Sequence, residues 1–75
     1  MKCVLFKASD WQFIDLIEVN SISELVHEFG EVIVNYNHHH KEPEAFMEFY
    51  GLDEEMAKQA AEIEFEVMIY DDYIE

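Results

Sequence analysis

The first part of the chain consists of two apolar runs separated by a short polar break. "KCVLFKA" covers residues 2 to 8 and "QFIDLIEV" covers residues 12 to 19, and both are rich in side chains that favour strands. Ser9 and Asp10 between them suit a tight turn. The pattern therefore predicts a β-hairpin over residues 2 to 19. Both runs are apolar on two faces, so at least one of them is expected to be central in its sheet.

An amphipathic helix is predicted next, over "SISELVHEFG" at residues 21 to 30. Ser21 and Glu24 have the spacing of a capping box, and Gly30 supplies a stop. Apolar residues recur between them with helical spacing, at Ile22, Leu25, Val26 and Phe29. "EVIVNY" at residues 31 to 36 follows directly and predicts a third strand.

Periodicity is lost in "NHHHKEPE", and helical signals return after it. Pro43 favours the first turn of a short helix through "EAFMEFY", which Gly51 would end. Asp53 suits the cap of a further helix through "EEMAKQAAE". Whether residues 43 to 61 form one helix or two stays open.

The closing segment, "EIEFEVMIYDDYIE", is predicted to be a strand. At 100° per residue its acidic and apolar side chains would scatter around a helix. At 180° per residue Glu62, Glu64 and Glu66 share one face. The opposite face then carries the apolar residues Ile63, Phe65, Val67 and Ile69. We expect the carboxylates to point outward and the apolar residues to point into the core.

These elements predict a single α+β domain over residues 1 to 75. Leu, Ile, Val and Phe number 23 of the 75 residues, enough for a folded core despite the charge. The expected architecture is a small β-sheet of about four strands, built from a hairpin, a helix, a strand, short helices and a C-terminal strand. The helices are expected to cover one face of the sheet.

The charge balance narrows the possible partners. Eighteen Asp and Glu residues stand against four Lys and Arg residues, which gives a net charge of −14. Such a charge argues against DNA, RNA and anionic lipid as direct ligands, and favours either a basic partner or simple solubility. Residues 42 to 75 hold 12 of the 18 acids beside one lysine, Lys58, so the charge is concentrated in the second half.

No pattern in the chain predicts catalysis or a cofactor. No Ser, Thr or Cys nucleophile has a recognisable base beside it, no glycine-rich loop is present to cradle phosphate, and arginine is absent. The single cysteine, Cys3, is expected to be a structural strand residue. Since the chain has no catalytic pattern, we expect a non-enzymatic protein. Because no apolar run approaches the length of a membrane span and the start is too short for a signal peptide, we expect it to be cytoplasmic.

Two groups of residues raise the question of metal binding. His38, His39 and His40 are contiguous, and histidine is a common ligand of transition metals. In an extended segment only His38 and His40 share a side, and no Cys or HExxH pattern completes a site, so an exposed loop is favoured. Asp71, Asp72 and Glu75 offer oxygen ligands to a hard cation but lack the order of an EF-hand loop. We therefore assign no metal.

The final strand and the start of the preceding helix form the predicted partner-binding surface. Carboxylates at alternate positions of a strand lie roughly 6.6 Å apart, so a stiff strand holds them where a basic groove expects phosphates. Met and Tyr side chains, which the cores of interfaces favour, lie among the acids. The predicted contact residues are Glu54, Glu55, Glu62, Glu64, Glu66, Tyr70, Asp71 and Asp72.

In size, charge and lack of catalytic residues, the whole chain resembles the small anti-defence proteins of bacteriophages and mobile elements, including anti-CRISPR and anti-restriction proteins. This resemblance implies a stoichiometric inhibitor that mimics DNA or RNA and occupies the basic groove of a host nuclease or defence complex. Such an inhibitor would act in the host cytoplasm if it is phage-encoded. Two alternatives stay open: a structural or assembly protein that forms a homodimer and uses its acids only for solubility, and a cation-binding module.

Overall fold

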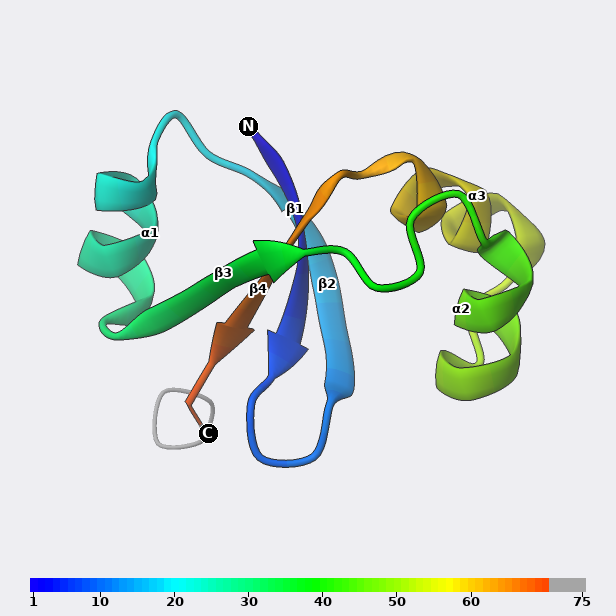
Figure 1. Ribbon diagram of the computed structural model, residues 1–75. Helices are drawn as coiled ribbons and strands as arrows, with labels where there is room; N and C mark the ends of the chain where they lie inside the picture. The colour runs from blue at the N-terminus through cyan, green and yellow to red at the C-terminus, as the bar shows by residue number, and fades with distance from the viewer. Residues whose placement is uncertain (71–75) are drawn as a thin grey trace.

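The computed structural model describes residues 1–70, which form one four-stranded mixed sheet with three helices (Figure 1). In chain order the elements are β1 (Lys2–Lys7), β2 (Gln12–Glu18), α1 (Ile22–Phe29), β3 (Val32–Tyr36), α2 (Pro43–Tyr50), α3 (Glu54–Glu62) and β4 (Phe65–Ile69). The predicted α+β class and the predicted order of elements are confirmed. The open question about the segment after Pro43 is also answered, because it forms two helices.

Local sequence signals explain where the helices begin and end. The Ser21 hydroxyl accepts the backbone N–H of Glu24 at 3.3 Å, and the Glu24 carboxylate accepts the backbone N–H of Asn20 at 2.9 Å, so the predicted capping box forms. Asp53 caps α3 by accepting a backbone N–H three residues later, at 2.8 Å. Gly51, in the left-handed conformation at φ 68°, ends α2 and separates the two helices.

The strands are arranged in the order β2-β1-β4-β3. β1 pairs antiparallel with β2 across the hairpin and parallel with β4, while β3 pairs antiparallel with β4. The last strand of the described chain is therefore a central strand, with hydrogen-bonded neighbours on both sides (Figure 1). This position decides the fate of the side chains on β4.

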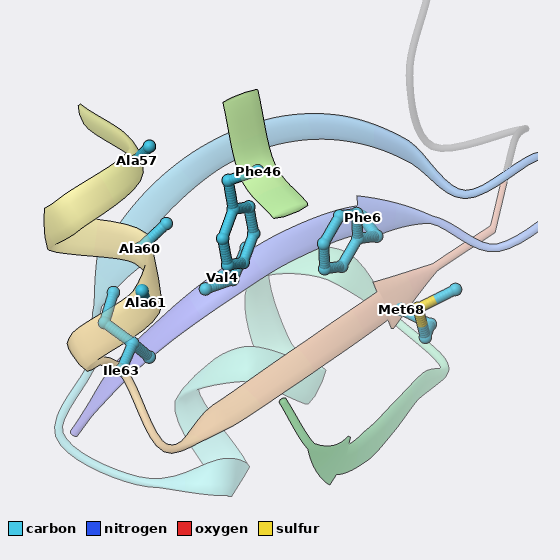
Figure 2. Close-up of a cluster of buried hydrophobic side chains, with 8 residues drawn as sticks. All are labelled: Val4, Phe6, Phe46, Ala57, Ala60, Ala61, Ile63 and Met68. Atoms are coloured by element: carbon cyan, nitrogen blue, oxygen red, sulfur yellow. The ribbon is translucent and has the colours of Figure 1, made fainter. Parts of the chain in front are cut away.

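Helices cover both faces of the sheet. Val4 and Phe6 of β1 point toward α2 and α3, where they join a buried cluster completed by Phe46, Ala57, Ala60, Ala61, Ile63 and Met68 (Figure 2). Cys3 and Leu5 point to the opposite face, where they pack with Leu25 of α1. Figure 1 shows α1 on one side of the sheet and the α2–α3 pair on the other.

The expected placement of all helices on one face is therefore wrong in that detail. Its physical reason lies in the two central strands, β1 and β4, which carry apolar residues on both faces. A strand of that kind must be shielded from water on both sides. One helix and a helix pair supply the two covers.

Candidate functional site

The predicted row of carboxylates on the final strand does not exist in the structure. Glu62 is the last residue of α3, and Glu64 is exposed in the connection before β4. Glu66 is on β4 but is 0% exposed. On the opposite face Val67 is buried as predicted, whereas Phe65 is 39% exposed at the start of the strand.

This correction has a clear physical cause. Alternation along a strand separates side chains onto two faces, but it leaves open whether either face meets water. β4 is central and lies under α2 and α3 on the face that receives Glu66. The outward-facing acidic strand predicted from the sequence is therefore replaced by one buried acid and two exposed acids beside the strand.

The remaining predicted contact residues are separated from Glu66. Glu54 and Glu55 are exposed in the first turn of α3, where their negative charges interact favourably with the positive end of the helix dipole. Tyr70 is partly exposed directly after β4. Asp71 and Asp72 lie outside the described residues.

Glu66 is held by the histidine segment, 28 positions away in sequence. Its Oε1 accepts the backbone N–H of His38 at 3.2 Å, and its Oε2 lies 3.1 Å from the His38 ring nitrogen Nδ1. Because a carboxylate only accepts hydrogen bonds, this contact favours the His38 tautomer that carries its proton on Nδ1. The His38 side chain is 60% exposed, so its other nitrogen, Nε2, is left for solvent or a ligand.

The histidine segment is a fixed turn rather than an open loop. The buried Asn37 donates its side-chain amide to the carbonyls of Ala60 at 3.1 Å and Ile63 at 2.8 Å, and so joins the turn to the end of α3. The Tyr36 hydroxyl lies 2.6 Å from Nδ1 of His40. Among residues 1–70, no group of three or more His, Cys, Asp or Glu side chains is placed to hold a metal ion.

Aromatic rings extend from this turn across the molecule. The His38 ring meets Trp11 edge-on with centroids 5.3 Å apart, and Trp11 lies 5.8 Å from Phe6 in the core. On the other side, His39 stacks on Phe49 with centroids 5.7 Å apart. Sequence analysis missed this cluster because its rings come from the β1–β2 turn, the histidine turn and α2. The only local signal was the density of aromatic residues in "EAFMEFY" and the lone tryptophan.

Two surface hollows lie next to these features. The larger, which we call the acidic hollow, has a volume of about 580 Å³ and lies where β1 begins and α3 ends. It is lined by Glu18, Glu62 and Glu64 together with Met1, Lys2, Leu16, Ile17, Gln59, Ile63 and Phe65. The smaller, which we call the aromatic hollow, has a volume of about 400 Å³ and is lined by Asp10, Trp11, Gln12, Phe13, Phe49 and Tyr50.

The half-buried Tyr50 and the buried Cys3 show how the interior treats charge. Burial raises the pKa of Tyr50, and the negative charge of Glu66 raises it further. Burial also raises the pKa of the Cys3 thiol, although the positive N-terminus acts in the opposite direction. Both side chains therefore stay neutral at pH 7, and Cys3 is a structural thiol as predicted rather than a reactive one.

The function of the chain has to be inferred from this geometry. No protein-family model matches the chain, and no curated protein or solved structure matches it significantly. Within residues 1–70, no helix has the length and apolar character needed to cross a bilayer.

Proposed function

We propose that this protein binds the basic surface of another protein, and that the acidic hollow is the centre of the contact. The observation that carries the proposal is the combination found there: three exposed carboxylates, Glu18, Glu62 and Glu64, against one lysine, Lys2, around a partly apolar floor. Lysine and arginine side chains pair an apolar stem with a charged head. The floor suits the stem, and the rim suits the head.

The charge around the hollow extends over the helix pair. All eight acids between residues 42 and 64 are exposed, and the only basic residue in that range is Lys58, which lies 3.6 Å from Glu54. Glu44 and Glu48 are four residues apart on α2 and so lie on one side of that helix. Charges fixed on helices lose less conformational entropy on binding than charges on a flexible tail.

In the specific form of the proposal, the partner is a nucleic-acid-binding protein and the acids substitute for phosphates. Carboxylates four residues apart on a helix are separated by a rise of about 6 Å. A helix holds carboxylates at this spacing as rigidly as a strand does. The net charge of −14 supports this form, because complementary fields speed association with a basic groove. A nuclease or a defence complex, as in the anti-defence proteins that the chain resembles, is the partner class we propose.

A pair of variants with equal net charge tests the proposal. The first converts Glu18, Glu62 and Glu64 to glutamine, and the control converts the exposed acids Asp15 to asparagine and Glu28 and Glu31 to glutamine. Binding to a panel of purified nucleases is measured at 50 mM and 300 mM NaCl. We expect binding that weakens with salt, is displaced by added DNA or RNA, is lost in the first variant and is kept in the control.

The opposite result is equally clear. If both variants bind alike, the acidic hollow is not the contact, and only overall charge matters. If the unmodified protein binds no basic protein at the lower salt concentration, the proposed function is wrong. If binding occurs but nucleic acid does not displace it, the mimicry is wrong while the basic partner stands.

A homodimer is a second candidate, favoured by an exposed apolar pair on α1. Ile22 and Val26 are four residues apart and are both exposed, while Leu25 on the same helix is buried. Self-association through this pair would bring together two chains that each carry a net charge of −14. Because salt screens their repulsion, salt should strengthen the dimer. Sedimentation velocity in a salt series, with Ile22→Ser and Val26→Ser, therefore separates the two candidates, since salt weakens binding to a basic partner.

A further inference from the structure

We propose that the aromatic hollow receives one cationic side chain of the basic partner, an arginine or a lysine, as the anchor of the complex. The inference rests on the proposed function and names the group that the partner contributes. The hollow is formed where the β1–β2 turn meets the end of α2, and four of the six residues that line it are aromatic. None of the six is basic, so a cation would enter without displacing one.

The walls of the hollow suit a cation of this size. Trp11 is 41% exposed and Phe49 is 65% exposed, so both rings present surface to a ligand. The π-face of an aromatic ring attracts guanidinium and ammonium groups, and the attraction is stronger for tryptophan than for tyrosine or phenylalanine. Asp10 adds a carboxylate, which is held in place by accepting the backbone N–H of Gln12 at 3.2 Å.

The tryptophan wall is fixed by the buried carboxylate described above. Glu66 holds the His38 ring, and the His38 ring packs edge-on against Trp11. Phe6 supports Trp11 from the core. Trp11 also has φ 59°, a left-handed backbone that disfavours bulky residues, and the backbone N–H of Trp11 donates to the Lys7 carbonyl at 2.9 Å. The ring is therefore positioned before a ligand arrives, which lowers the entropy cost of binding.

The electrostatic field in the hollow has the required sign. Burial raises the pKa of Tyr50, whose side chain is part of the wall, and the negative charge of Glu66 raises it further. The Glu66 contribution reports a negative potential at the wall, which favours a cation there. His38 is the only side chain that pairs with Glu66 among the described residues, and it is largely exposed, so its charge when protonated is well hydrated.

The experiment uses the intrinsic fluorescence of Trp11, which is the single tryptophan of the chain. The probes are an acetylated eight-residue peptide that alternates glycine with arginine, and the same peptide with the uncharged isostere citrulline. Phe49→Ala and Asp10→Asn alter the hollow. Met47→Ala, an exposed position on the same helix, and Asp15→Asn, an exposed position on the neighbouring strand, are matched controls.

We expect a saturable change in Trp11 fluorescence with the arginine peptide and binding at least about tenfold weaker with the citrulline peptide, because the neutral isostere loses the attraction of the rings. Phe49→Ala and Asp10→Asn should weaken binding roughly three- to thirtyfold. The two controls should stay within about twofold. Urea midpoints close to that of the unmodified protein confirm that the variants are folded, as the exposure of Phe49 leads us to expect.

Equal affinity for the two peptides, or an equal effect of Phe49→Ala and Met47→Ala, would overturn the inference. Its failure can be told apart from failure of the proposed function. If binding of the arginine peptide depends on Glu18, Glu62 and Glu64 but not on Phe49, the proposed anchor is wrong. The proposal of a basic partner then still stands. Absence of any peptide binding also overturns the anchor, whereas the proposed function is decided by the protein-binding measurement.

Discussion

Replacing Glu66 tests the most unusual feature of the fold, a buried acid in the centre of the sheet. Glutamine keeps the shape and one carbonyl acceptor for the backbone N–H of His38, but it loses the charge that strengthens the contact with the ring. Hydrogen bonds to charged groups contribute about 1.5–3 kcal/mol and neutral ones about 0.5–1.5. Glu66→Gln should therefore lower the free energy of unfolding by about 1 kcal/mol.

Glu66→Ala should cost more, because it removes both acceptors and leaves a void. An unpaired buried N–H costs about 1–3 kcal/mol, and the void adds to this, so we expect a total of about 3 kcal/mol or more. A domain of this length has a stability of roughly 4–11 kcal/mol, so the alanine variant approaches the limit of folding. Glu66→Met also removes both acceptors, but it fills the space with apolar atoms and should cost less than alanine because it leaves no void.

The control for the charge is Glu64→Gln, an exposed position two residues earlier. It relieves the same net charge without touching a buried bond, and surface changes of this kind stay within about 0.5 kcal/mol. Urea unfolding followed by Trp11 fluorescence and far-ultraviolet circular dichroism measures both variants at pH 7. If Glu66→Gln and Glu64→Gln shift the midpoint equally, the burial and pairing of Glu66 do not stabilise the fold and the reasoning is refuted.

Three further predictions follow from charge, burial and backbone. Raising NaCl from 20 mM to 500 mM should raise the urea midpoint, because salt screens the repulsion of a chain at −14; an unchanged midpoint would contradict this. Burial raises the pKa of Cys3 above its ordinary 9.0 and that of Tyr50 above 10.0, so the folded state holds these protons more tightly. The contribution of these two groups to stability should then be constant below pH 9, and stability should fall as the pH rises further, with a smaller fall in Cys3→Ala. Gly51→Ala should destabilise by about 1–2 kcal/mol from its left-handed backbone alone, since no atom lies within 4 Å of the added methyl group; a neutral effect in thermal unfolding would contradict that account.

Local patterns predicted the elements well, because their causes are local. The capping box at Ser21, the left-handed stop at Gly51 and the cap at Asp53 each act within one turn of chain. Strand pairing has no such local cause. β4 lies between β1 and β3 through contacts with residues at least 29 positions away, so its exposure could not be read from its own alternation.

The candidate site was missed for the same reason. Glu66 lies on β4 and contacts His38, which follows the end of β3. Trp11 contacts the His38 ring from the β1–β2 turn. The sequence presented the three histidines as a loop and the glutamates as a surface row. The contact between the buried Glu66 and the exposed His38 joins these two features. Every acid between residues 42 and 64 is exposed, so the predicted acidity of the second half is found on different elements.

The fold alone does not explain why a chain with so much negative charge buries the carboxylate of Glu66. An apolar residue of similar volume at position 66 would leave the sheet as well packed and remove a charge that repels the rest. Glu66 differs from such a residue in what it orients, namely the His38 ring and through it Trp11. Glu66→Met is therefore informative in binding as well as in unfolding. A folded methionine variant that binds the arginine peptide more weakly assigns Glu66 to the aromatic hollow, through its charge and its hold on the His38 ring, whereas unchanged binding assigns it to the fold alone.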